Sequence, residues 1–215
     1  MQRLALISIA LVAACGGSTP QAADAADPPA PPGFPLTLES ANGRVATLER
    51  PAERVLPGNA GALDLLLAVA DEDVVAGLNA GTRPYSIALQ DAGVLADAPL
   101  LSTFDMEAIA TLDPDLILTH AWQTLDKGPF LQRMQIPVLE LGSSDSLDAI
   151  LLDLERIGRA LDLEQRAAEL TASLRARAAS LLETDRSELV AMTLSGGSGG
   201  SWSAGSGTTD ALVVE

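Results

Sequence analysis

Few side chains in this sequence are of the types that bind metals or catalyse reactions. His120 is the only histidine, and it follows the aliphatic run Leu116-Ile117-Leu118. A histidine at the end of a buried strand could coordinate haem iron axially or simply hydrogen-bond a neighbouring loop, and both interpretations stay open. The count disfavours a site for bare zinc or manganese, because such a site needs several histidine and carboxylate ligands that converge.

The aromatic residues are scarce enough to be considered one by one, since the chain has only two Trp, one Tyr and three Phe. Phe130 is expected in the core, and Phe34 ends an N-terminal linker. The four that fall in predicted loops are Tyr85, Phe104, Trp122 and Trp202. An exposed ring is costly unless it stacks on a ligand or covers apolar atoms, so these four suggest a cleft for a flat or apolar molecule. The alternative is that each ring packs against its own loop.

One segment matches the pattern of a catalytic serine motif but lacks the residues that would complete the site. Gly196-Gly197-Ser198-Gly199-Gly200 matches the Gly-x-Ser-x-Gly nucleophile turn, but no histidine follows Ser198 to act as its base. The same segment lacks the lysine of a phosphate-binding loop and the spacing of a dinucleotide-binding motif. The sequence therefore predicts a protein that is not an enzyme.

Composition excludes other classes. The 215 residues are 47% hydrophobic, enough to build a core, and 29 acidic residues outnumber 13 basic ones. A net charge of −16 repels nucleic acid and anionic lipid headgroups, so no nucleic-acid partner is expected.

The N-terminus has the features of an export signal. Arg3 precedes an apolar run, Leu4 to Ala13, that is too short to span a bilayer stably. Cys15 follows small residues in a pattern that resembles the lipobox of bacterial lipoproteins, so residues 1–15 are expected to be a lipoprotein signal whose cysteine is lipidated. An ordinary signal with an incidental buried cysteine is the alternative. Residues 16–35, rich in Ala, Pro, Gly and Asp, are predicted to be a disordered tether.

Hydrophobic periodicity predicts the first elements of the folded part. Alternating apolar positions on both sides of Asn42-Gly43 predict a hairpin over residues 36–48. Arg54 to Leu56 is a short predicted strand, after which Asn59 can cap a helix over Ala60 to Ala70. Val74 to Leu78 is predicted to be another strand.

The second half of the pattern continues this alternation. Asp105 can cap a helix over Met106 to Leu112, which Pro114 ends before the buried strand at 116–118. The elements predicted after it are a helical segment at 130–134, a strand at 137–141, a helical pattern at 147–182 that breaks near 161–162, and a strand at 189–192.

This alternation implies an α/β fold with a parallel sheet wrapped by helices on both faces. Ligands of such sheets meet the loops at the carboxyl ends of the strands. The loops in question are 58–59, 79–86, 119–123 and 141–144.

The order of these motifs resembles the iron-complex and cobalamin substrate-binding proteins of bacterial ABC importers. The resemblance runs from about Leu36 to Asp210, and its most specific part is the stretch from Glu107 to Leu118. It implies that residues 36–145 form the N-terminal α/β lobe of a class III periplasmic binding protein. Residues 146–185 would be a helical segment that includes the interlobe helix, and 186–215 the start of an incomplete second lobe.

The resemblance also implies a function and a set of residues. The protein would capture a ferric siderophore, cobalamin or haem between its lobes and deliver it to a membrane permease, as a monomer with no cofactor of its own. The ligand would contact Asn59, Arg83, Tyr85, Trp122 and Trp202. Glu107 would dock onto basic residues of the permease; alternatively, it only stabilises the first turn of its helix.

Two further expectations qualify this assignment. Because Arg83 is the only obvious basic loop residue, a neutral hydroxamate siderophore or cobalamin is slightly favoured over haem. Measured against the family pattern, the second lobe is expected to stop after a strand and part of a helix, so the runner-up hypothesis is a truncated envelope lipoprotein that acts as an interaction module without transport. Either way, the protein is expected outside the cytoplasm, held at the membrane only by its lipid anchor.

Overall fold

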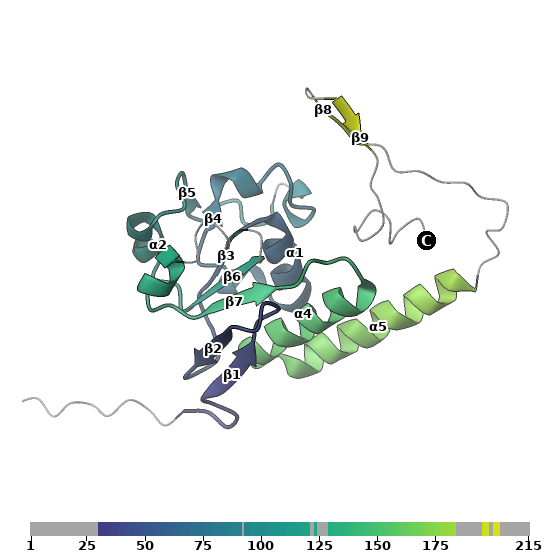
Figure 1. The fold of residues 1–215 in the computed structure, drawn as a ribbon, viewed down its shortest axis with the longest axis horizontal. Coiled ribbons are helices and arrows are strands. Elements are labelled where there is room, and N and C mark those ends of the chain that lie inside the picture. The colour runs from purple at the N-terminus through teal and green to yellow at the C-terminus, as the bar shows by residue number, and fades with distance from the viewer. Residues whose placement is uncertain are drawn as a thin grey trace, which may run out of the picture.

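The computed structural model describes residues 30–91, 93–120, 123, 129–183, 195–197 and 200–202 (Figure 1). The strands are β1 (Leu36–Glu39), β2 (Val45–Leu48), β3 (Val55–Pro57), β4 (Leu78–Asn79), β5 (Leu100–Leu101), β6 (Leu116–His120), β7 (Val138–Leu141), β8 (Ser195–Gly197) and β9 (Gly200–Trp202). The helices are α1 (Ala60–Val69), α2 (Met106–Leu112), α4 (Leu147–Ala160) and α5 (Glu164–Leu182). Short 3₁₀ helices lie at Glu72–Val74, Ala80–Thr82 and Ala88–Gln90, and residues 129–133 are also helical.

The centre of the fold is a parallel sheet with the strand order β3-β6-β7. Leu56 pairs with Ile117 in one strand pair, and Leu118 pairs with Leu139 in the other. A parallel connection cannot be made by a tight turn, so helical segments must cross over between these strands. The parallel α/β sheet that the sequence predicts is therefore present.

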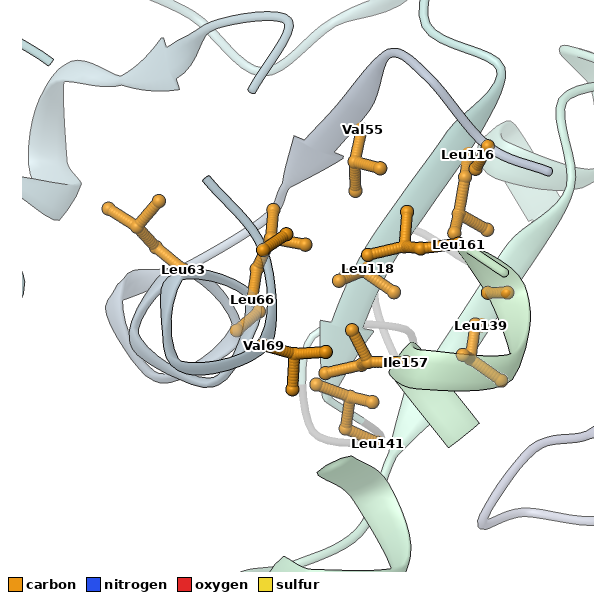
Figure 2. Packing of buried hydrophobic residues seen from close by; sticks show 14 of the residues in the cluster. Val55, Leu63, Leu66, Val69, Leu116, Leu118, Leu139, Leu141, Ile157 and Leu161 are labelled. Atoms are coloured by element: carbon orange, nitrogen blue, oxygen red, sulfur yellow. The ribbon is translucent and has the colours of Figure 1, made fainter. Parts of the chain in front are cut away.

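One face of the sheet is covered by α1, α4 and α5. Alternate strand residues, among them Val55, Leu116, Leu118, Leu139 and Leu141, point into this layer because successive side chains of a strand face opposite sides. Figure 2 shows these residues meeting Leu66 and Val69 of α1 on one side and Ile157 and Leu161 on the other. This is the larger of the two core clusters.

The opposite face is covered by α2 and the helical stretch at 129–133. Here the intervening strand residues Leu56, Ile117 and Val138 pack against Ile109 of α2 and Leu131. Because both faces are covered, β6 is buried along its whole length, as the aliphatic run predicts. Phe130 packs against this cluster, in agreement with its expected place in the core.

The predicted helix boundaries are found with their predicted caps. Asp105 accepts a hydrogen bond from the Ala108 amide at 2.9 Å, and this bond, with one from the Thr103 hydroxyl, lowers the pKa of the Asp105 carboxyl. At the other end of α2, Asp113 adopts a left-handed conformation (φ 47°) before Pro114. The helical pattern at 147–182 also breaks as predicted, with Asp162 at φ 58° between α4 and α5.

The N-terminal hairpin forms as predicted, with β1 antiparallel to β2 and Gly43 at φ 80° in the turn. Its backbone is joined to β7, because the Ala41 amide donates to the Glu140 carbonyl at 2.9 Å. The hairpin thus lies beside the edge strand of the central sheet.

The prediction of a five-residue strand at Val74 to Leu78 is wrong. Val74 ends a 3₁₀ helix, Val75 makes only an isolated bridge to Val55, and Leu78 begins a separate parallel pair with Leu100. The pairing partner changes within the segment, because the Ala76 amide donates to the Val55 carbonyl whereas the Leu78 amide donates to the Pro99 carbonyl. Gly77 lies between them, where a Cβ would be 2.6 Å from a methyl carbon of Leu112 on α2. The pairing strand β5 was not predicted.

Several predictions fall outside the described residues. These are the export signal with Cys15, residues 16–29 of the tether, and the strand at 189–192. The division into domains stays a prediction.

Candidate functional site

Asn59 is the first residue that the fold places at the carboxyl end of the sheet. It follows β3 after Gly58, and its Oδ1 caps α1 by accepting from the Ala62 amide at 2.9 Å. This cap fixes the orientation of the amide, so Nδ2 must donate. It lies 3.1 Å from Nδ1 of His120 and 2.7 Å from Oε1 of Gln123.

Gln123 links the ends of β3 and β6. Its Oε1 also accepts from the Thr119 hydroxyl at 2.8 Å, and its Nε2 donates to the Gly58 carbonyl at 3.0 Å. A Cβ on Gly58 would lie 3.0 Å from Oε1 of Gln123, so glycine permits this close approach. The three amide and hydroxyl side chains form one rigid polar cluster.

His120 belongs to this cluster as a neutral side chain. Asn59 Nδ2 can only donate, so Nδ1 of His120 accepts and the proton of the neutral ring lies on Nε2. Burial lowers the pKa of the imidazole below its ordinary value of 6.5, and the negative charge of Asp153 offsets part of the shift. Of its two predicted roles, the geometry supports the hydrogen bond to a loop residue.

A second loop, residues 79–90, lies opposite the start of α1 and carries Tyr85. The carboxylate of Asp64 on α1 accepts from the amides of Ile87 and Ala88 at 3.0 and 3.1 Å. At the start of the loop, Oδ1 of Asn79 accepts from the Gly81 amide at 3.0 Å. The two bonds to Asp64 tie the loop to α1, and the Asn79 bond fixes the turn at the start of the loop.

Residues 58–61, the loop at 79–90 and Gln123 line an open cavity of about 330 Å³, here called the strand-end cavity. Its lining residues are Gly58, Asn59, Ala60, Gly61, Asn79, Gly81, Thr82, Tyr85 and Gln123. The Tyr85 side chain is 79% exposed, so its ring is available to a bound molecule. The cavity lies where parallel α/β sheets bind their ligands.

The structure brings together only some of the predicted ligand residues. Asn59 and Tyr85 line the strand-end cavity, whereas Arg83 does not, because its guanidinium donates to the Leu95 carbonyl at 3.0 Å. Trp122 lies outside the described residues. For Trp202 only the backbone is described, in β9 opposite Ser195.

The hypothesis of a common aromatic cleft needs a correction. Phe104 does lie in a loop, but its ring packs against the core cluster of Leu56 and Ile117. Phe34 packs against the other core cluster and therefore belongs to the folded part. Tyr85 is the one ring among the described side chains that lines the strand-end cavity.

Glu107 lies in the first turn of α2 and is exposed. This place fits both of its predicted roles, a contact for a permease and a favourable charge at a helix N-terminus. Docking stays a prediction.

Two residues of the site were not identified from the sequence. Gln123 lies in a segment with no recognisable periodicity, so nothing distinguishes it from other loop residues. Asp64 did leave a signal, because it is the only charged residue in an otherwise apolar helix. A charge in such a helix needs a partner, and here the partners are loop amides.

Two kinds of feature are absent from the part of the chain that the structure describes. No group of three or more His, Cys, Asp or Glu side chains is arranged to hold a metal ion. Among the described helices, none combines the length and hydropathy needed to cross a bilayer.

No protein-family model and no curated protein sequence matches the chain, but solved structures do. The petrobactin-binding protein YclQ from Bacillus subtilis superposes with a TM-score of 0.68 at 19% identity, over 83% of this chain and 63% of that one. The TroA-like periplasmic binding protein FepB from Veillonella parvula gives 0.57 at 22% identity, over 69% and 49%. A Fe³⁺-hydroxamate transport protein from Saccharomonospora viridis gives 0.53 at 27% identity, over 68% and 55%.

The chain therefore spans about half to two thirds of the length of these proteins. All three are named as binding or transport proteins. Its parallel sheet, covered on both faces, has the fold of one lobe of the class III, TroA-like periplasmic binding proteins.

Proposed function

We propose that this protein is the substrate-binding component of an ABC importer and that it captures a metal chelate, with a ferric siderophore as the first candidate. The observation that carries the proposal is the strand-end cavity with its exposed tyrosine, on a fold whose solved examples include proteins named for petrobactin and Fe³⁺-hydroxamate. Cobalamin and haem are the other chelates to test.

The chemistry of the cavity favours a neutral chelate. Its lining, as far as the structure describes it, contains amides, a hydroxyl, a phenol and small residues, but no charged side chain. Arg83, the obvious partner for a carboxylate, is bound to the Leu95 carbonyl. A hydroxamate siderophore, neutral when loaded with Fe³⁺, needs no such partner, whereas haem carries two propionates.

The remaining parts of the proposal concern the location and the partner. A lipid on Cys15 would hold the domain at the outer side of a membrane, and the segment between Cys15 and the folded part, which includes Phe34, would act as its tether. Glu107, exposed on α2, would then contact a permease.

The proposal is tested by titrating the mature protein with a ferric hydroxamate siderophore, cobalamin and haem, using absorbance changes or calorimetry. We expect saturable binding of at least one chelate. Tyr85→Ala should weaken that binding about fivefold, since a stacked ring contributes roughly 1 kcal/mol.

Ile87→Ala is the matched control. Ile87 is similarly exposed and lies on the same loop, but it does not line the cavity, so this variant should bind like the wild type. Failure of all three chelates to bind would contradict the proposal and favour the interaction module without transport.

A further inference from the structure

The fold buries one carboxylate without giving it a hydrogen bond. Glu140 of β7 is only 1% exposed, and neither of its carboxylate oxygens has a hydrogen-bond partner among the described residues. The nearest cation is the guanidinium of Arg44, whose Nη1 lies 3.6 Å from Oε1 and whose side chain is half exposed. Burial of an ionised carboxylate is costly unless it is paired and hydrogen-bonded, so this group has unused binding capacity.

The main chain of Glu140 is, by contrast, fully bonded. Its amide donates to the Ser40 hydroxyl at 3.0 Å, and its carbonyl accepts from the Ala41 amide at 2.9 Å. Both partners belong to the N-terminal hairpin. The hairpin therefore fixes the backbone of Glu140 in place beside Arg44.

Glu140 and Arg44 both line an open groove of about 540 Å³ between β2 and residues 131–138, here called the hairpin groove. The other lining residues are Val45, Ala46, Thr47, Leu131, Gln132, Gln135, Ile136, Pro137 and Val138. Val138 and Glu140 are two residues apart on β7, so their side chains share a face of the strand. The groove shares no residue with the strand-end cavity.

This combination specifies the chemistry of a ligand. The two oxygens of this carboxylate, neither of which accepts a hydrogen bond from the described residues, match the parallel N–H groups of a guanidinium or amidinium, which form two hydrogen bonds at once. The aliphatic walls suit an apolar stem. A metal ion fits less well, because it would need further anionic ligands and no cluster of three exists in the described part of the chain.

We propose that the hairpin groove binds a small planar organic cation, a guanidinium or amidinium on an apolar stem, through a bidentate contact with Glu140. Arg44 already places a guanidinium next to Glu140, although its Nη1 does not come within hydrogen-bond distance of Oε1. An incoming cation displaces it towards solvent. The net charge of −16 attracts cations to the surface in general, and the groove adds the specific contact.

The probe is benzamidine, and its control is neutral benzamide, which has the same shape. Each is titrated into the mature protein, and binding is measured by calorimetry or by NMR. We expect benzamidine to bind and benzamide not to bind. Glu140→Gln keeps the side-chain size but removes the charge, and it should weaken benzamidine binding at least tenfold. Arg44→Ala removes the competing guanidinium and should leave the affinity equal or higher.

A second variant tests the groove without altering the buried carboxylate. Val45 lies in the groove lining and is 61% exposed, so Val45→Lys should fold normally and place a competing ammonium at the groove. It should lower the affinity for benzamidine. Tyr85→Ala should not change it, which separates this site from the proposed chelate site.

Two results would overturn the inference. One is benzamidine affinity that is unchanged in both Glu140→Gln and Val45→Lys. The other is the absence of binding to the wild type and to Arg44→Ala, which would mean that the chain itself satisfies Glu140.

Discussion

At the scale of single residues, one asparagine connects the fold with the candidate site. Oδ1 of Asn59 caps α1, and its Nδ2 donates to His120 and Gln123. The residue that starts the helix thus also fixes the ends of two strands. Both N–H donors of its Nδ2 are used inside the protein, so we expect its contribution to ligand binding to be mainly the shape of the cavity wall.

His120 gives a prediction about pH. Because burial lowers its pKa, the unfolded chain binds more protons than the folded one between the folded pKa and 6.5. The free energy of unfolding should therefore rise with pH through this window and fall as pH decreases below 6.5. His120→Gln removes the titrating group, so its stability should depend less on pH, as measured by urea denaturation between pH 7.5 and 5.5.

The wild type and His120→Gln can be compared directly, because carboxylates that titrate at lower pH affect the stability of both proteins alike. Parallel pH profiles for the wild type and His120→Gln would show that the imidazole is not held neutral. The attraction of Asp153 limits the size of the difference without changing its sign.

At the scale of elements, the contact between α4 and α5 depends on one glycine. A Cβ on Gly158 would lie 2.4 Å from the Cβ of Ala167, closer than real carbon atoms approach. Glycine in a helix normally costs about 1 kcal/mol relative to alanine, so its presence here reflects the close packing of the two helices. The turn at Asp162 then sends α5 back along α4 (Figure 1).

Gly158→Ala should therefore destabilise the protein although it improves helix propensity. Overpacking costs about 1 to 3 kcal/mol, against a propensity gain of about 1 kcal/mol, so we expect the free energy of unfolding in urea to fall by up to about 2 kcal/mol. Combining it with Ala167→Gly removes the clash, and the double variant should lose less than the sum of the two single changes. A more stable Gly158→Ala protein would exclude such close packing.

At the scale of the whole molecule, the described lobe presents its candidate sites on different surfaces. The strand-end cavity is formed by residues at and after the ends of β3, β4 and β6, whereas the hairpin groove lies between β2 and the segment before β7. Glu107 is exposed on α2, which lies on the opposite side of the lobe from α5 (Figure 1). A chelate, an organic cation and a permease could thus be bound without competing for one surface.

The proposed anchor gives the prediction at this scale. Cys15→Ala removes the thiol to which a lipid would be attached, so the protein should move from the membrane pellet to the soluble fraction of the cell envelope. Fractionation and immunoblotting measure this, and Cys15→Ser should behave in the same way. A variant that stays in the pellet would contradict lipidation at this position.

Most of the fold could be predicted because helix caps, helix breakers and apolar runs in the sequence favour the same elements that the packed structure contains. Asn59, Asp105 and Pro114 fixed helix boundaries, and the aliphatic run of β6 implied burial on both faces. The segment from Val74 to Leu78 misled because a run of aliphatic residues does not distinguish a strand from an extended segment packed on a helix. The site was less predictable: Asn59 and Tyr85 were expected, but Gln123 and Asp64 act through partners far away in the sequence.

The sequence by itself determined the class of fold, the order of its elements and the parallel sheet, because these follow from hydrophobic period, caps and breakers within about ten residues of one another. Only the tertiary structure decided which loop residues share a cavity. It turned Arg83 towards a carbonyl, packed Phe104 on the core and buried Glu140 beside an open groove. Such outcomes depend on contacts between distant segments, which a local pattern does not encode.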